Sequence, residues 1–277
     1  MAQQQISIKA SDGTMLHGTH WALDQPKAIV VLVHGLGEHV DRYAHMAAAY
    51  AKEGFAMLGF DRRGHGRSEG QRGHTPSLAH LLDELNLAIA FAKKSYPNVP
   101  VILFGHSMGG NLVLTYALQE QREELAGIIS SAPWIRLVKP PGALLVAAAK
   151  LLTPIMPGVA QSNGLDASHL SKDQQVVDAY INDPLVHDKI TLQTGLSLMN
   201  AATELDTFKG SIDFPLLMIH GKEDQITDPK GSAAFAKRVG GPIEYQMYDG
   251  LYHEMHNEVE QQEVFNKATN WMKEILS

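Results

Sequence analysis

Cysteine is absent from the 277-residue sequence. This absence excludes disulfides, thiolate metal sites, iron–sulfur clusters and a cysteine nucleophile. Positive charge is also scarce, because 23 Lys and Arg residues stand against 30 Asp and Glu residues and give a net charge of −7. The chain has no run rich in Lys and Arg, so it lacks the clustered basic surface that nucleic acids require. We therefore expect no nucleic-acid partner.

Signals for export or membrane insertion are missing as well. The first residues, MAQQQISIKASDG, contain neither a basic region nor an apolar core, so the expected compartment is the cytoplasm. The most apolar stretch, Gly142–Met156, is shorter than the ~20 residues that span a bilayer and contains Lys150 and Pro154. We expect no transmembrane segment, but peripheral contact of this stretch with a membrane stays open.

The rest of the sequence alternates short apolar runs with helical patterns. Six runs predict strands, at Ala28–Val33, Phe55–Phe60, Val99–Phe104, Gly127–Ser130, Phe214–Ile219 and Ile243–Tyr248. Most are almost continuously apolar, which is typical of parallel strands buried on both faces. A further pair of strands is predicted on either side of the Asp12-Gly13 turn. The pattern predicts an α/β fold with a mostly parallel central sheet flanked by helices.

One interval departs from this alternation. From about Trp134 to Phe208, helix-like segments occur with no strand between them. The interval is too long for a loop. We expect residues 1–277 to form a single α/β domain, with residues 134–208 inserted as a helical cap over one end of the sheet.

The segment most informative for function is GHSMG at residues 105–109, between a predicted strand and a predicted helix. A G-x-S-x-G sequence in this place puts the serine on a sharp, strained turn, so that its hydroxyl stands clear of the sheet. Gly105 and Gly109 let neighbouring backbone approach closely. The motif alone would also fit a Gly-rich turn with Ser107 as a helix cap. Its position between strand and helix favours Ser107 as a nucleophile.

A second loop offers half of an oxyanion hole. The sequence HGLG at residues 34–37 follows the predicted strand Ala28–Val33. Acyl-transfer enzymes with this elbow aim two backbone N–H groups at the oxyanion, from the residue after the nucleophile and from a loop after an early strand. These donors would be the amides of Met108 and Leu36. The alternative is that HGLG is only a tight turn.

A nucleophilic serine also needs an acid and a histidine base, which follow it in that order in this kind of fold. Asp224 is the natural acid because it comes just after a predicted strand, and Glu223 and Asp228 are its rivals. The base should follow the last strand, where His253 and His256 both occur. His253 is favoured because it comes just after a turn and before the next helical pattern.

Two other polar segments contain residue types that are common in catalytic or metal sites. HEMHN at residues 253–257 nearly matches the H-E-x-x-H metal motif, but its histidines are three residues apart instead of four. We therefore expect no metal site. DRRGHGRS at residues 61–68 follows a predicted strand, and we interpret it as a structural loop held by charged hydrogen bonds.

Several motifs together resemble the monoacylglycerol lipases of the α/β-hydrolase superfamily. They are HGLGEH, DRRGHGRSEG, GHSMGG, VVDAYINDPL, HGKEDQITDPKG and YHEMHNE. The similarity runs from about Lys27 to the C-terminus. It implies the α/β-hydrolase fold and a serine hydrolase that releases a fatty acid from monoacylglycerol without a cofactor. It also implies an amphipathic cap that meets lipid.

The resemblance assigns roles by position. It makes Ser107 the nucleophile, Asp224 the acid and His253 the base, with the amides of Leu36 and Met108 as oxyanion donors. Leu36 stands where mammalian members usually have alanine, which matters little for a backbone donor.

Substrate contacts are assigned in the same way. Glu38, Arg42 and Tyr180 match positions that shape the glycerol end of the site in the family. Leu144 and Leu145, in the apolar stretch, are expected to line an acyl tunnel or to rest on lipid. The alternative is a cap helix that simply packs on the core.

Other functions remain open at this point. A carboxylesterase for short acyl chains or a lysophospholipase would use the same chemistry, but the apolar stretch favours a long acyl tail and the lack of a basic patch disfavours phosphate head groups. A peptidase fits the fold, although no sequence feature favours it. A catalytically inactive ligand-binding protein on this scaffold should have lost a member of the triad, and here each member has a candidate.

Overall fold

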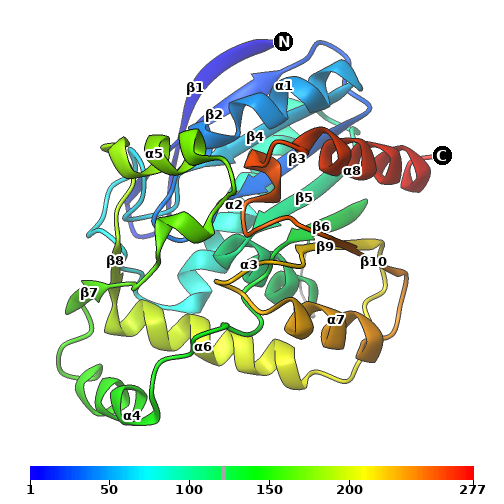
Figure 1. Ribbon diagram of the computed structural model, residues 1–277. Helices are drawn as coiled ribbons and strands as arrows, with labels where there is room; N and C mark the ends of the chain where they lie inside the picture. Colours follow the sequence, from blue (N-terminus) through cyan, green and yellow to red (C-terminus); the bar gives the residue numbers. More distant parts are fainter. Residues whose placement is uncertain (120–122) are drawn as a thin grey trace.

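A central eight-stranded sheet organises the computed structural model, which describes residues 1–119 and 123–277 (Figure 1). The strands are β1 (Ala2–Lys9), β2 (Met15–Ala22), β3 (Ala28–Val33), β4 (Phe55–Phe60), β5 (Val101–His106), β6 (Gly127–Ser131), β9 (Leu216–Gly221) and β10 (Ile243–Tyr248). Their order across the sheet is β1-β2-β4-β3-β5-β6-β9-β10. The strands from β4 to β10 in that order are parallel, and β1 and β2 form an antiparallel hairpin at one edge. The predicted mostly parallel sheet is confirmed.

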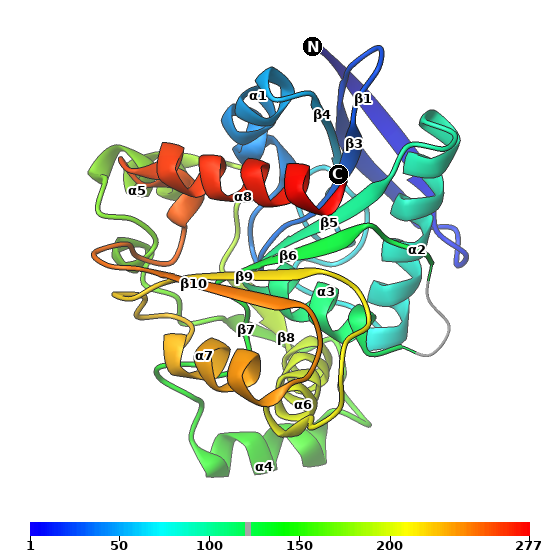
Figure 2. The same cartoon turned by 90° about the vertical axis from the view of Figure 1, so that its right-hand side faces the viewer.

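Strand β3 shows why its sequence does not alternate. Ile29, Val31 and Val33 pack into the core on one face, and Val30 and Leu32 pack into the core on the other. The helices of the first face are α2 (Leu78–Ser95), α3 (Met108–Ala117), α6 (Leu192–Thr207) and α7 (Pro229–Arg238), and those of the second are α1 (Ala44–Lys52) and α8 (Gln261–Ile275). Figure 2 shows the two helical layers on opposite sides of the sheet. Both faces of β3 are therefore buried, whereas the edge strands β1 and β10 are partly exposed.

Two strands begin later and end later than the apolar pattern predicts. β5 begins at Val101, directly after Pro100, and β9 begins at Leu216, directly after Pro215. A proline has no N–H to donate to the ladder, so it delays the start of a strand. At the other end the pairing continues through polar residues, because His106 still pairs with Ser131 on β6. The ladder thus carries the chain up to Ser107.

The interval 134–208 contains α4 (Ala143–Leu152), β7 (Ala160–Ser162), the 3-10 turn η2 (Ala167–His169), α5 (Gln174–Asn182), β8 (Lys189–Thr191) and α6. The sequence pattern did not predict β7 and β8, which pair antiparallel in a small sheet of their own. Strands of three residues are too short to produce a periodic signal. Helix α6 packs against α3 in the layer below the main sheet, so the interval also contributes to the core.

Helix α4 is the most exposed helix of this interval. It has no buried residue, and the side chains of Leu144 and Leu151 are 86% and 75% exposed. Ile155, just beyond the helix, is 79% exposed. Within the described ranges, no helix is both long and apolar enough to cross a bilayer.

The contact between α3 and the end of β3 requires a glycine. A Cβ atom added at Gly109 would lie 1.9 Å from the carbonyl oxygen of Val33, and one at Gly105 would lie 2.2 Å from the carbonyl oxygen of Gly109. Only residues without side chains let the strand, the turn and the helix approach this closely. The two glycines of the G-x-S-x-G sequence therefore set the position of α3 on the sheet.

Replacement of Gly109 by alanine should lower the free energy of unfolding by about 1–3 kcal/mol, because the new methyl group must push the helix away from Val33. The matched control is Gly195→Ala in α6, where the nearest atom would be Ile190 Cδ1 at 3.7 Å. That substitution should raise the free energy of unfolding by about 0.5–1 kcal/mol, as expected for alanine in an unhindered helix. Urea unfolding measures both values. Equal changes in the two variants would contradict the close-contact argument.

Candidate active site

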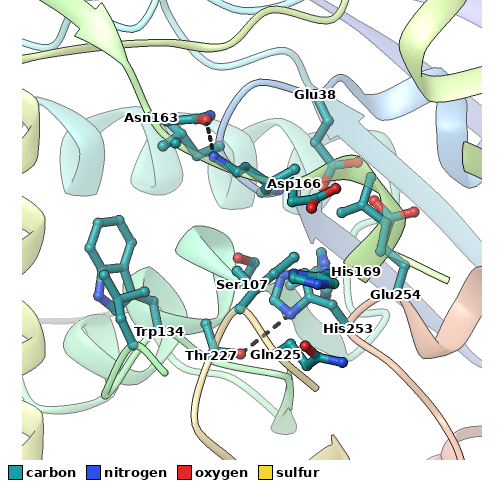
Figure 3. Close-up of a pocket in the computed structure, with 18 of the residues that line it drawn as sticks. Glu38, Ser107, Trp134, Asn163, Asp166, His169, Gln225, Thr227, His253 and Glu254 are labelled. Atoms are coloured by element: carbon teal, nitrogen blue, oxygen red, sulfur yellow. Dashed lines mark hydrogen bonds between the residues drawn. The ribbon is translucent and has the colours of Figure 1, made fainter. Parts of the chain in front are cut away.

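Ser107 occupies the turn between β5 and α3 with φ 55° and ψ −114°. A positive φ is uncommon for a residue with a side chain and persists only where the surroundings enforce it. Here the Ser107 N–H donates to the carbonyl oxygen of Ser131 at 2.9 Å, and the Ser107 carbonyl oxygen accepts from Asn111 and Trp134 amides at 3.0 and 3.1 Å. The backbone is thus fixed on both sides, and the side chain faces a pocket (Figure 3).

Asp224 and His253 meet beside Ser107 from two loops. Asp224 follows β9, His253 follows β10, and the His253 Nδ1–H donates to Asp224 Oδ2 at 2.7 Å. Asp224 Oδ1 accepts from the amides of Ile226 and Thr227 at 2.7 and 3.0 Å. Both side chains are buried, and His253 lines the same pocket as Ser107 (Figure 3). The structure therefore brings together the three residues that the sequence singled out.

The protonation of this pair follows from its surroundings. Burial lowers the pKa of the His253 imidazole, but the adjacent Asp224 carboxylate stabilises the charged ring, and the net effect raises the pKa. Burial raises the pKa of Asp224, yet the neighbouring His253 and His220 rings hold it well below its usual range. Asp224 is therefore ionised at neutral pH and orients a histidine that can gain a proton from a neighbour.

The other candidate acids lie elsewhere. Asp228 is the N-cap of α7, where its side chain accepts from the Lys230 amide at 2.9 Å. Glu223 is exposed to solvent. Neither carboxylate is hydrogen-bonded to His253, so the geometry favours Asp224 as its partner.

His256 has a different environment from His253. Its ring stacks on Tyr43 at a centroid distance of 4.5 Å, and both ring nitrogens are buried without a hydrogen-bond partner. Burial lowers the pKa of His256 to about 3, so the ring is neutral. In the parts of the chain that the structure describes, no group of three or more His, Cys, Asp or Glu side chains could hold a metal ion. His256 thus packs as a neutral aromatic ring against His106, at a centroid distance of 4.8 Å.

Glu38, Arg42 and Tyr180 form one cluster with Glu254, which the sequence reasoning missed. The Arg42 guanidinium donates to both carboxylate oxygens of Glu254 at 2.6 and 2.7 Å and to Glu38 at 2.6 Å. It also lies over the Tyr180 ring at 4.8 Å. Burial alone would raise the pKa of Glu254, but Arg42 lowers it to about 2. The signal in the sequence was the position of Glu254, next to the candidate base.

The loop that contains Leu36 is held by side chains on both flanks. The Gly35 N–H donates to Glu38 Oε1 at 2.6 Å, and the His34 Nδ1–H donates to the Gly35 carbonyl oxygen at 2.7 Å. Met108 is the first residue of α3, so its N–H belongs to the amides that have no acceptor within the helix. Leu36 lines the pocket, and Met108 directly follows Ser107.

The pocket in front of Ser107 has a volume of about 410 Å³. Its apolar lining residues are Leu36, Trp134, Leu137, Leu165, Leu170, Ile190 and Ile226. Figure 3 shows Trp134 on the opposite side of Ser107 from Glu38 and Glu254. Most of these residues come from loops whose sequences carry no periodic signal. Trp134 and the two glutamates thus lie on opposite sides of Ser107 in a pocket that has both apolar and polar lining residues.

The apolar stretch of the sequence does not take part in this lining. Leu144 and Leu145 lie on α4, are 86% and 48% exposed, and are not among the pocket residues. The two leucines thus lie outside the pocket in front of Ser107, α4 contacts α6, and the expected contact with lipid stays a prediction.

The loop at residues 61–68 is hydrogen-bonded and ion-paired to neighbouring segments, in agreement with its interpretation as structural. Asp61 accepts from the amides of Val40 and Arg67 at 2.9 and 2.8 Å. Arg63 forms a buried ion pair with Glu84 on α2. The Asp61–Val40 bond ties the segment after β4 to the segment after β3, and the Arg63–Glu84 pair ties it to α2.

Comparisons with known proteins agree with this architecture. Residues 24–260 match a family model described as "Serine aminopeptidase, S33". The chain is 35% identical to a monoacylglycerol lipase of Mycolicibacterium smegmatis over 91% of this chain and 90% of that protein. It is 32% identical to a monoglyceride lipase of Rattus norvegicus over 95% of this chain and 88% of that one. It also matches 27% of the length of a longer abhydrolase domain-containing protein of Dictyostelium discoideum, at 36% identity.

Solved structures of lipases have the same fold as this chain. The crystal structure of a monoacylglycerol lipase from Paleococcus ferrophilus has a TM-score of 0.80 and 30% identity, over 99% of this chain and 100% of that one. A soluble variant of monoglyceride lipase from Saccharomyces cerevisiae has a TM-score of 0.89 at 24% identity, over 100% and 97%. The predicted α/β-hydrolase fold is thus confirmed. The chain belongs to the monoacylglycerol lipase family of the α/β hydrolases and is a carboxylic ester hydrolase.

Proposed function

We propose that this chain releases a fatty acid from monoacylglycerol, with Ser107 as nucleophile, His253 as base and Asp224 as the acid that orients it. The observation that carries the proposal is the strained Ser107 turn beside the buried His253–Asp224 hydrogen bond, in a pocket lined by both apolar and polar side chains. This is the arrangement that acyl-enzyme chemistry needs.

In the first half of the reaction, His253 takes the proton from the Ser107 hydroxyl as its oxygen attacks the ester carbonyl. Asp224 stabilises the imidazolium that forms. The amides of Leu36 and Met108 bind the oxyanion of the tetrahedral intermediate. His253 then gives its proton to the leaving glycerol oxygen, and the acyl group stays on Ser107.

In the second half, His253 takes a proton from water as the water oxygen attacks the acyl carbonyl. The second tetrahedral intermediate collapses, His253 returns the proton to the Ser107 oxygen, and the fatty acid leaves. All the groups required are side chains or amides of this chain.

The positions of Trp134 and of Glu38 and Glu254 on opposite sides of Ser107 support an orientation for the substrate. The hydroxyl groups of glycerol would meet Glu38, Tyr180 and Glu254, whose polar atoms provide hydrogen-bond partners. The acyl chain would lie against Trp134, Leu137 and the other apolar residues that line the pocket, because burial of methylene groups is favourable by about 0.8 kcal/mol each. The names of the M. smegmatis and R. norvegicus relatives support the same substrate.

The name of the family model raises aminopeptidase activity as another outcome. An aminopeptidase needs a free carboxylate to bind the α-ammonium group of its substrate. The carboxylates of Glu38 and Glu254 are already paired with Arg42. Asp166 also lines the pocket and has no arginine partner among the described residues, so the preference for ester hydrolysis rests on the relatives, which are named monoacylglycerol and monoglyceride lipases.

Residues 134–208 act in this proposal as a cap that meets the lipid phase. Helix α4 and the residues after it expose apolar side chains at Leu144, Leu151, Ile155 and Met156. Exposed apolar side chains of this kind can rest on a lipid surface. Such contact would bring a membrane-borne substrate to the protein without a transmembrane segment.

A hydrolysis panel tests the activity. It contains long-chain and short-chain monoacylglycerols, di- and triacylglycerols, lysophospholipids, p-nitrophenyl acetate and amino-acid p-nitroanilides. Monoacylglycerols should give the highest kcat/KM, and Ser107→Ala should lower kcat by ~10⁴–10⁶. Higher activity on lysophospholipids or nitroanilides would show that the proposed substrate class is wrong. Activity of Ser107→Ala within tenfold of the wild type would show that Ser107 is not the nucleophile.

The identity of the base is tested by pH profiles. Because His253 must be neutral to accept a proton and its pKa is raised above 6.5, kcat/KM should fall as the pH drops through a value above 6.5. Asp224→Asn should lower kcat by ~10⁴ and move this acidic limb to lower pH. His253→Ala should lose nearly all turnover, whereas His256→Ala should keep a measurable share. The reverse order of the two histidine variants would reassign the base.

Contact of α4 with lipid is tested by Leu144→Asp. Hydrolysis of long-chain monoacylglycerol in phospholipid vesicles should fall several-fold, because a charge on the exposed face resists transfer to the membrane. Hydrolysis of a short-chain soluble ester and the free energy of unfolding should stay unchanged, since the side chain is 86% exposed. Val259→Asp, at another exposed apolar residue, is the control and should change neither activity. Equal losses on both substrates would argue against lipid contact.

A further inference from the structure

The loop at residues 34–38 is hydrogen-bonded to a segment far away in the sequence. The N–H and carbonyl groups of Gly35 are bonded to Glu38 and His34, within the loop itself. The carbonyl oxygen of Gly37 instead accepts from the backbone N–H of His187 at 2.9 Å. His187 lies between α5 and β8, in the proposed cap, and does not line the pocket. The amide of Leu36 lies between these fixed points.

The His187 ring anchors this contact. Its Nε2–H donates to the carbonyl oxygen of Gly64 at 2.9 Å, and its Nδ1 accepts from the Lys189 amide at 3.1 Å. The ring also packs on His65 at a centroid distance of 4.8 Å. A neutral imidazole has one donor and one acceptor, and both are used here. Burial lowers the pKa of His187, which favours this neutral form.

Close packing makes the contact sensitive to small shifts. Gly37 has φ +82°, and a Cβ atom added there would lie 2.3 Å from the carbonyl oxygen of His187. The two backbones therefore touch with no side chain between them. A displacement of residue 187 must displace Gly37, and with it the neighbouring Leu36 amide.

We propose that His187 is a positioning residue for ester hydrolysis, whose ring fixes the segment that holds Gly37 and thereby aims the Leu36 amide at the oxyanion. The inference rests on the proposed function only in taking the Leu36 amide as an oxyanion donor. It adds a role for a cap residue that touches neither the substrate nor the triad.

The expected size of the effect follows from what oxyanion donors contribute. Complete loss of one donor costs ~10²–10³ in kcat. Release of the His187 ring leaves the donor present but less well fixed, so we expect a loss of about tenfold. The loss should fall on kcat and not on KM, because the oxyanion exists only in the transition state and intermediates.

Three substitutions of His187 test the role of its Nε2–H donor separately from the role of the rest of its ring. In His187→Gln the amide nitrogen can reach the place of Nε2 and still donate to Gly64, whereas His187→Asn retains only a group near Nδ1. His187→Phe keeps the ring contact with His65 and loses both hydrogen bonds. On p-nitrophenyl acetate, Asn and Phe variants should lower kcat about tenfold with KM within twofold, and His187→Gln should stay within threefold of the wild type. The Asn and Gln variants decide the question even where the Phe variant does not fold.

His74→Phe is the matched control for general loosening of the cap. His74 Nδ1 is hydrogen-bonded to Thr191 Oγ1 at 3.0 Å, at the far end of β8, and His74 has no bond to the loop at residues 34–38. This variant should leave kcat within twofold. A second readout is the inhibition constant of a boronic acid that forms a tetrahedral adduct with a catalytic serine, which should rise about tenfold in His187→Asn and not in His74→Phe.

Specific outcomes would overturn the proposal. Equal kcat values for the Asn and Gln variants, or an equal loss in His74→Phe, would reduce His187 to a structural residue. The proposed function fails by different measurements, namely turnover by Ser107→Ala or a preferred substrate other than monoacylglycerol. The small ester contacts little of the acyl side of the pocket, so the variants can be compared on it whichever lipid the enzyme prefers.

Discussion

The close approach of the α3 N-terminus to the end of β3 is the contact on which the site depends. It exists because Gly109 has no Cβ, which would lie 1.9 Å from the Val33 carbonyl oxygen. The same contact forces the chain through the strained conformation of Ser107 and points the first amides of α3 at the end of the sheet. The loop at residues 34–38 begins directly after Val33. This packing constraint thus fixes the nucleophile and the Met108 amide, and it sets the starting point of the loop that carries the Leu36 amide.

The buried charged side chains near Ser107 are each paired and hydrogen-bonded. Asp224 is satisfied by His253, His220, Thr227 and two backbone amides. Arg42 is shared by two carboxylates that approach it from the loops after β3 and β10. Buried ions are costly unless each is paired and hydrogen-bonded. Because these pairs bridge separate loops, they hold the loops in register at the carboxyl end of the sheet.

Sequence reasoning succeeded where a local pattern has one structural solution and failed where the contact is between distant segments. The apolar runs predicted the positions of the strands, and the prolines at positions 100 and 215 explain why β5 and β9 begin later than predicted. The three-residue strands β7 and β8 carry no pattern of their own. Glu254 and His187 were missed because their partners, Arg42 and Gly64, are far away in the sequence.

The sequence by itself determined the parallel sheet, the glycine-flanked elbow and the order of Ser107, Asp224 and His253, since each follows from short-range periodicity or spacing along the chain. Tertiary structure alone decided how the contacts of His253 and His256 differ, which side chains line the pocket and where the apolar leucines of α4 lie. His253 and His256 are three residues apart and chemically identical. Their difference arises only when β9 and β10 pair side by side and bring one of them to Asp224.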